Sequence, residues 1–302
     1  MDFFCICTLA FTLFFGGCSE NTPDILPEED NIDIPLEDDN TDFTVMSYNI
    51  HYGRGIDGTL NLDRIAGVIK AADPDILVLN EVDRNYDPRS NYQDQLEILA
   101  EQLDMYYQFQ KTTWKAPIPA SSNKPREFGH AVLSKYPVEH MDDFIYKKYK
   151  THYHGLLETR IKVGAHTVYV YATHLDVDQE CLESQVGELL TKMSKREGLK
   201  ILCGDLNATP DNIAIRQISN IYTDAFKNQN SAFTFKSNRP TIRIDYITTC
   251  PCSPGVDTWY VAPGKPIDVF EYYIRTYTED EWIVSPEPIG LAAWIDSSDE
   301  YF

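Results

Sequence analysis

Five polar residues of the kinds that bind metal ions or phosphate stand at or just after the ends of apolar segments of the chain. Loops at the ends of neighbouring strands converge on one edge of a sheet, so these residues are expected to lie close together. Their carboxylate and amide oxygens suit Mg²⁺ or Mn²⁺, and no spacing of cysteine or histidine indicates zinc. The five residues are Asn49, Glu81, His174, Asp205 and Asn207.

Each of these residues taken alone also fits an ordinary structural role. Asn49 fits a turn, Glu81 a solvated strand end, and His174 a hydrogen-bonded surface or core histidine. The segment 205–210 fits a loop that caps a helix beginning near Asp211. A single short motif is weak evidence, whereas the residues in this order and spacing together indicate one functional site.

The hydrophobic pattern predicts the elements that would position this site. Asn61 is the expected N-cap of a helix whose apolar face includes Leu62, Ile65 and Ile69, and Pro74 ends that helix. Helices alternate with strands and hairpins along the chain, which indicates a layered α/β sandwich. Strands are expected at residues 43–50, 75–81, 128–134, 156–163, 166–174, 199–205 and 241–248, and helices at 61–70, 93–103, 182–196 and 211–218.

Two regions show no clear element. Lys111, Lys115, Lys124 and Arg126 are expected in a loop, where they would contact a phosphorylated substrate or simply be solvated. Beyond about residue 250 the chain is acidic and aromatic, and its pattern assigns neither helix nor strand.

The composition favours one large domain with an acidic surface. Of the 302 residues 43% are hydrophobic, which is enough for a single buried core, and Lys+Arg 26 against Asp+Glu 47 gives a net charge of -21. Such a surface repels the phosphate backbone, so nucleic-acid binding by charge alone is disfavoured. A bound metal ion inverts the charge of a site locally, so a nuclease activity is weakened rather than excluded.

The N-terminus resembles an export signal. An apolar run from Phe3 to Phe15 ends in Gly16-Gly17-Cys18, which predicts a signal peptide over residues 1–18 with Cys18 as the lipid attachment site. The segment lacks Lys and Arg, and an apolar N-terminus without a targeting role is the alternative. Residues 19–42 are acidic and contain three prolines, which is typical of an extended tether, and residues 43–302 form the expected domain.

The remaining cysteines leave the redox state open. Cys203 lies in an apolar strand pattern and is expected in the core. Cys250 and Cys252 are too close for an easy bridge to each other, and a disulfide from Cys181 or Cys203 to this pair stays possible in an oxidising compartment.

Six short segments in order resemble the motifs of the endonuclease/exonuclease/phosphatase superfamily, which includes deoxyribonuclease I, inositol-polyphosphate phosphatases and neutral sphingomyelinases. The resemblance runs from about residue 43 to 248, roughly two thirds of the chain, and within 49–84 it is strongest to the bacterial, often secreted, branch. The Gly-Asp-x-Asn and x-x-Glu elements, in this sequence order, are quite specific. The segments are Ser47–His51, Leu79–Arg84, Gly129–Ser134, Thr173–Asp176, Gly204–Asn207 and Ile244–Ile247.

The resemblance implies a four-layered α/β sandwich with two facing mixed sheets, and it implies roles for the site residues. Glu81, helped by Asn49, would hold Mg²⁺ or Mn²⁺, which polarises a phosphoryl oxygen. Asp205 would orient or activate the attacking water, and Asn207 would position it. His174 would donate a hydrogen bond to the phosphoryl oxygens as negative charge develops on them.

The resemblance also implies a last motif that this sequence lacks. In the superfamily, Asp245 would orient a histidine of a Ser-Asp-His segment, yet His174 is the last histidine of the chain. The nearest shape is Val284–Ile289, where Glu287 stands near the lost position. Asn80 also replaces the usual Gln beside the metal-binding glutamate.

The expected function is therefore metal-dependent hydrolysis of a phosphate ester, most simply a small or lipid-headgroup phosphodiester. The alternatives are a catalytically impaired module that binds a phosphate or headgroup, or a truncated relative of an active nuclease-like enzyme. The expected partners are a phosphorylated small molecule or lipid headgroup, and a membrane reached through the lipid on Cys18, whereas nucleic acid is disfavoured. We expect a monomer exported to the outer membrane or cell surface.

Overall fold

A computed structural model describes residues 43–164, 166–229, 232–237 and 239–249, together with the backbone of residues 270–274. All of these residues belong to one compact unit, Asp38–Phe302. The predicted signal peptide with Cys18, the tether, Cys250, Cys252 and Glu287 lie outside the described residues. None of the helices formed by the described residues is long and apolar enough to cross a membrane.

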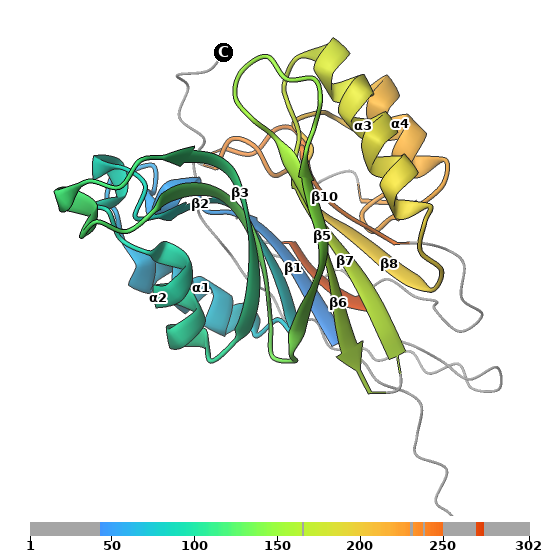
Figure 1. Ribbon diagram of the computed structural model, residues 1–302. Coiled ribbons are helices and arrows are strands. Elements are labelled where there is room, and N and C mark those ends of the chain that lie inside the picture. Colours follow the sequence, from blue (N-terminus) through green and yellow to red (C-terminus); the bar gives the residue numbers. More distant parts are fainter. Residues whose placement is uncertain (1–42, 165, 230–231, 238, 250–269, 275–302) are drawn as a thin grey trace, which may run out of the picture. The chain divides into compact units, whose positions relative to one another are not determined.

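Two mixed β-sheets form the centre of the fold (Figure 1). The first sheet has the strand order β11-β1-β2-β4-β3, and only its β1–β2 pair is parallel. Its strands are β1 (Phe43–Asn49), β2 (Ile76–Arg84), β3 (Tyr106–Lys115), β4 (Arg126–Ser134) and β11 (Phe270–Ile274).

The second sheet has the strand order β5-β6-β7-β8-β10-β9, and only its β7–β8 pair is parallel. The two parallel pairs, β1–β2 and β7–β8, carry most of the residues proposed for the site. The strands of this sheet are β5 (Val138–Ile145), β6 (Gly155–Val163), β7 (His166–His174), β8 (Leu199–Asp205), β9 (Thr223–Asp224) and β10 (Asp245–Thr249).

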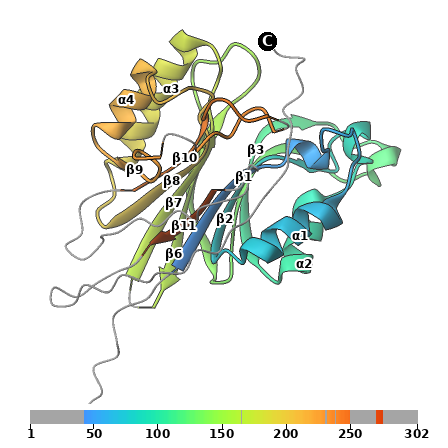
Figure 2. The same ribbon diagram turned by 180° about the vertical axis from the view of Figure 1, so that it is seen from behind.

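Four helices cover the outer faces of the two sheets. Helices α1 and α2 lie on the first sheet, and α3 and α4 lie on the second, as the opposite views show (Figures 1 and 2). Each helix begins with an Asp or Asn side chain that accepts a backbone N–H of the first turn. The helices are α1 (Leu62–Ala72), α2 (Gln95–Leu103), α3 (Gln179–Met193) and α4 (Ile213–Ser219), and short 3₁₀ helices occupy His51–Gly53, Pro88–Ser90 and Pro119–Ser121.

Three apolar clusters hold the layers together, because successive side chains of a strand point to opposite faces of its sheet. Val78 of β2 and Val170 of β7 belong to the cluster between the two sheets. Leu77 and Leu79 of β2 pack instead with α1 and α2, and Leu202 of β8 packs with α3 and α4. The layer order is therefore helices, sheet, sheet, helices, which confirms the four-layered sandwich that the family resemblance implied.

Most of the predicted elements are confirmed, including the hairpin of β6 and β7 and the Asn61 cap, whose side chain accepts the Arg64 N–H at 2.9 Å. The predicted loop is wrong at Arg126, Lys111 and Lys115, because Arg126 begins β4 and the two lysines lie in β3. This strand is an edge of its sheet, where polar and charged side chains face solvent and hide the strand pattern. Strand β5 was missed for the same reason, and β11 lies in the tail that showed no pattern.

Candidate active site

The ends of β1, β2 and β8 bring three of the predicted site residues into direct contact. The Asn49 side-chain amide donates to Glu81 Oε1 at 2.9 Å and to Asp205 Oδ2 at 3.2 Å. Asn49 and Glu81 come from the first sheet and Asp205 comes from the second, so the site lies across the two sheets at their shared edge. In the second sheet, His174 at the end of β7 is in register with Asp205 at the end of β8.

A β-bulge in β2 places the Glu81 side chain at this edge. The pairing of β2 with β4 shifts register between Leu79 and Val82. Both of these flanking residues pack into the cluster under α1 and α2, and Glu81 between them has a left-handed backbone with φ 58. Bulges and left-handed non-glycine residues are typical of functional sites, because they aim a side chain away from the regular alternation of a strand.

Asn80 connects the two sheets directly beneath the site. Its side-chain amide donates to the Thr173 carbonyl at 2.9 Å, and its Oδ1 accepts the Asp205 N–H at 2.9 Å. Gly204 allows this close approach, because a Cβ there would lie 1.9 Å from the Thr173 oxygen. The sequence identified Asn80 only as a departure from the family pattern. The structure shows a fully buried positioning residue for the Asp205 backbone.

Asn207 joins Asp205 to His174. The Asn207 N–H donates to Asp205 Oδ1 at 2.8 Å, and its side-chain amide lies 2.9 Å from His174 Nε2 and 2.8 Å from the Leu175 carbonyl. The carbonyl fixes the direction of the amide, so His174 Nε2 accepts a hydrogen bond and carries the free electron pair of the ring. Asp245 lies opposite Asp205 in the antiparallel pairing of β10 with β8.

The carboxylates of the site crowd one another with little positive charge among them. Burial, reinforced by the negative charge of Glu81, raises the pKa of Asp205 to about 7 against the hydrogen bonds from Asn207 and Asn49. Burial and the neighbouring Asp205 raise the pKa of Asp245 well above its ordinary value. Burial also opposes ionisation of Glu81, but His174 and His51 keep its pKa below the usual value. A donor set of three carboxylates and two amides fits a hard divalent cation, which would remove this repulsion.

A cluster of histidines lies on the other side of His174, and it corrects the expectation that no histidines gather. One ring nitrogen each of His152, His154 and His174 lies within 4.8 Å of the others. His154 Nδ1 donates to the His174 carbonyl at 2.9 Å. His130 lines the same small pocket as this cluster, and its Nε2 has no hydrogen-bond partner among the described residues.

Burial favours the neutral form of these imidazoles. Burial lowers the pKa of His152 to about 4 and that of His130 to about 3, and it also lowers the pKa values of His154 and His174. Neutral imidazoles suit borderline ions such as Zn²⁺. The free electron pair of His174, however, already accepts from Asn207, so the carboxylates and amides form the better prepared cation site.

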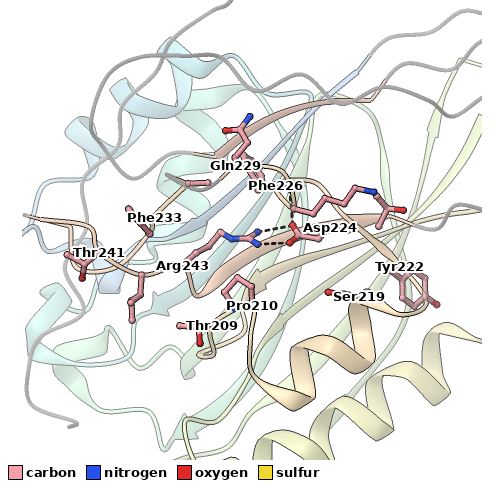
Figure 3. Close-up of a pocket in the computed structure, with 14 residues that line it drawn as sticks. Thr209, Pro210, Ser219, Tyr222, Asp224, Phe226, Gln229, Phe233, Thr241 and Arg243 are labelled. Atoms are coloured by element: carbon pink, nitrogen blue, oxygen red, sulfur yellow. Dashed lines mark hydrogen bonds and ion pairs between the residues drawn. The ribbon is translucent and has the colours of Figure 1, made fainter.

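A larger cavity of about 550 Å³ lies where β9 and the segment that precedes β10 meet the loop after Asn207 (Figure 3). Figure 3 shows Arg243 directed at Asp224, to which it donates hydrogen bonds of 2.8 and 2.5 Å. This arginine is therefore neutralised within the cavity wall. Phe233 also lines the cavity and is exposed.

All six residues predicted for the site lie at one edge of the sandwich, and other functional candidates were missed. Asn80, His130, His152 and His154 were not predicted. The available signal was the His-x-His spacing of residues 152 and 154, since alternate residues of an extended segment share a face. Cys181 and Cys203 are both buried free thiols, which confirms the core position of Cys203.

Comparison with protein families matches residues 46–286 to the Endonuclease/Exonuclease/phosphatase family, a span that includes all six site residues. The chain belongs to this family. It is accordingly a phosphoric ester hydrolase, of a family whose enzymes generally depend on a divalent metal. Comparison with curated protein sequences finds no match.

Solved structures of endonuclease/exonuclease/phosphatase proteins share the fold. An endonuclease/exonuclease/phosphatase from Beutenbergia cavernae is 23% identical to this chain, with a TM-score of 0.58. The match covers 78% of this chain and 71% of that one. A mannosyl-6-phosphatase of Bacteroides thetaiotaomicron is 17% identical, TM-score 0.57, covering 78% of this chain and 100% of that one. The catalytic domain of human nocturnin with bound sulfate is 20% identical, with a TM-score of 0.54. The match covers 78% of this chain and 93% of that one.

Proposed function

We propose that this chain is a Mg²⁺- or Mn²⁺-dependent phosphodiesterase that acts on a small or lipid-headgroup phosphodiester. The observation that carries the proposal is the contact of Asn49 with both Glu81 and Asp205, at 2.9 and 3.2 Å. It brings one carboxylate from each sheet to a single point, and such a pair supplies oxygen ligands of the kind that a hard cation takes. The cation, when bound, supplies the Lewis acid that polarises a phosphoryl oxygen.

The residues of the second sheet would carry out the proton transfer and stabilise the charge. Asp205 is held in place by the Asn207 N–H, and its carboxylate, kept ionised by the cation beside Glu81, would accept a proton from the attacking water. Asn207 would turn its amide from His174 to the water or phosphoryl group. His174, buried beside these groups, would donate to a phosphoryl oxygen from its ring as charge develops there.

The choice of a small substrate rests on charge. The net charge of -21 disfavours a long polyanion, and no motif of the sequence supplies a basic stripe for one. The name of the similarly folded mannosyl-6-phosphatase gives an example of a small phosphorylated substrate. The apolar segment ending in Cys18 supports export and a lipid anchor, which would place the enzyme at the cell envelope as a monomer.

A second candidate function is binding of a phosphorylated ligand without turnover. It is favoured by one observation, namely that residues 175–302 contain no histidine to pair with Asp245. General acid–base groups contribute roughly 10²–10⁴-fold, so loss of that histidine would leave a slow enzyme or an inactive binding protein.

Hydrolysis of a chromogenic phosphodiester separates the two candidates. The purified chain is assayed with Mg²⁺, Mn²⁺ or chelator, beside Glu81→Gln and a surface control, Glu139→Gln. Glu139 is exposed and pairs with Arg160 on β6, away from the site. An enzyme shows metal-dependent turnover that Glu81→Gln lowers at least about 1,000-fold and Glu139→Gln leaves intact. Absence of turnover together with calorimetric Mg²⁺ binding would establish the binding protein instead.

A further inference from the structure

Three exposed aromatic side chains gather on the surface beside the active site. Trp114 is 59% exposed, Tyr149 is 42% exposed and Tyr153 is 39% exposed. They come from the end of β3 and from the segment between β5 and β6, so distant parts of the sequence meet here. The Trp114 and Tyr153 rings are stacked at 6.1 Å and 21°, and the Tyr149 and Tyr153 rings lie 4.5 Å apart. We call these three residues the aromatic platform.

The platform adjoins the catalytic groups. Tyr153 lines the same small pocket as Glu81 and His174. His152, the neighbour of Tyr153, has its ring 6.0 Å from that of His174 and 6.5 Å from that of Phe128. A substrate whose phosphate lies beside Glu81 therefore has the platform within reach of the group that the phosphate carries.

The charges around the platform disfavour a second anionic group. Three lysines adjoin its residues in the sequence, and each pairs with a carboxylate. Their partners neutralise the positive charge that a further phosphate would need, and the whole chain carries a net charge of -21. The pairs are Lys115–Asp87 at 2.8 Å, Lys150–Asp178 at 2.6 Å, and Lys148–Glu180.

We propose that the aromatic platform binds an uncharged ring of the substrate, which stacks on Trp114 and Tyr153 while its phosphate ester occupies the site at Glu81. The inference rests on the proposed hydrolysis of a small phosphate ester and names its substrate class. Tryptophan and tyrosine present wide, rigid faces with a polar edge, and flat rings of nucleobases or the apolar faces of sugars stack on such surfaces. The platform selects the substrate and takes no part in bond cleavage.

A contact of this kind is made equally before and during the reaction. It therefore changes KM and leaves kcat nearly unchanged, whereas loss of a catalytic group changes kcat. This difference separates substrate recognition by the platform from damage to the catalytic groups.

The test compares methyl phosphodiesters of three primary alcohols, which present the same leaving group. Their second substituents are a hexose joined through its 6-position, a nucleoside joined through its 5′-position, and an ethyl group. We expect the wild-type chain to favour at least one ring ester over the ethyl ester by about tenfold or more in kcat/KM. The two ring arms show whether the ring is a sugar or a base.

Trp114→Ala is expected to raise KM for the preferred ring ester roughly tenfold and to leave the ethyl ester unchanged. Trp114→Phe keeps a flat ring and should retain most of the preference. Tyr106→Ala is the matched control, because Tyr106 is an aromatic residue at the other end of β3 and is 56% exposed. The control variant should match the wild type on all three esters.

Equal kcat/KM values for the ring and ethyl esters in the wild type would overturn the proposal. An equal loss of kcat/KM for both kinds of ester in Trp114→Ala would also overturn it. If no ester is hydrolysed with any metal, the proposed function fails separately. Calorimetry then decides the platform, with hexose 6-phosphate, a nucleoside 5′-phosphate and ethyl phosphate as probes. At least one ring phosphate must bind the wild type more tightly than ethyl phosphate and lose that advantage in Trp114→Ala, and equal affinities for all three would refute the proposal.

Discussion

His174 separates two regions of opposite character at the same edge of the sandwich. On one side, Glu81, Asp205 and Asp245 crowd together with amides as their main neighbours, and burial raises the pKa values of the two aspartates. On the other side, His152 and His154 carry imidazoles that burial keeps neutral. We call these the carboxylate side and the imidazole side.

The two sides differ in their need for a cation. Buried carboxylates held close together repel one another until a cation binds between them. The carboxylate side is therefore expected to favour binding of a metal ion. The imidazole side has no such imbalance, since its rings are uncharged and His154 already donates to the His174 carbonyl. We therefore expect the carboxylate side to control turnover and the imidazole side to shape the pocket.

Removal of the proposed base tests the carboxylate side most severely. Asp205→Asn keeps the size of the side chain and removes the group that would accept the proton from water. Metal-dependent phosphodiester hydrolysis should fall by about 10²–10⁴-fold in kcat, measured under saturating metal. If the variant retained a third of the wild-type rate, another residue would have to be the base.

Asn80→Ala tests how strongly the carboxylate side depends on the cross-sheet bridge. The change leaves the Thr173 carbonyl and the Asp205 N–H without their buried partner. We expect about 1–3 kcal/mol lower free energy of unfolding in urea, together with a fall in turnover of roughly 10–100-fold, because Asp205 loses its positioning residue. Normal turnover in the folded variant would show that Asp205 is positioned by its strand alone.

The pH dependence of metal binding sharpens the comparison through Asp205. Its pKa is about 7 in the folded chain, above the ordinary 3.8, so the folded state holds the proton more tightly than the unfolded state. In metal-free protein this contribution to stability is present at low pH and is lost as pH rises from about 4 to about 7.

A Mg²⁺ ion beside Glu81 favours the ionised form of the neighbouring Asp205, so it should raise Tm by several degrees more at pH 8 than at pH 5.5. Thermal unfolding with and without Mg²⁺ measures the difference. Asp205→Asn removes the titrating group and should make the Mg²⁺ effect equal at the two pH values. An equal Mg²⁺ effect at both pH values in the wild type would show that Mg²⁺ binding does not depend on the ionisation of Asp205.

The smallest effect is expected on the imidazole side. His152→Gln keeps a polar side chain. Among the described residues, His152 makes no hydrogen bond to any of the three carboxylates, although it lines a pocket with Glu81. Mg²⁺-dependent kcat should therefore stay within about threefold of the wild type. His140→Gln, an exposed histidine paired with Asp143 on β5, is the matched control. A loss as large as that of Asp205→Asn would abolish the distinction between the two sides.

The sequence predicted the carboxylate side because its residues follow or end apolar strands. Asn49, Glu81 and Asp205 occupy such positions, and the edge of a sheet gathers them. The imidazole side gave no comparable signal, since His152 and His154 precede a strand and come from the segment after β5, an edge strand that the pattern did not reveal. Tertiary pairing, which local pattern does not encode, brings them to His174.

The fold was predictable to a similar extent and for similar reasons. Strands buried in the middle of the sheets, such as β2 and β8, are continuous apolar runs and were located within a few residues. Edge strands β3 and β5 expose polar side chains and were missed. The bulge at Glu81 and the bridging role of Asn80 depend on contacts with β4, β7 and β8, so no window of the sequence contains them.

The left-handed backbone of Glu81 has a consequence for how such a chain would change if its activity were no longer needed. A glutamate with φ 58 is held in a conformation that glycine adopts freely. The proposed activity and stability therefore oppose each other at this one position, and Glu81→Gly would relax the backbone while deleting the proposed metal ligand. If selection for hydrolysis ceased, we expect substitutions at position 81 to appear early. A glycine there would indicate that the activity has been lost while the fold is retained.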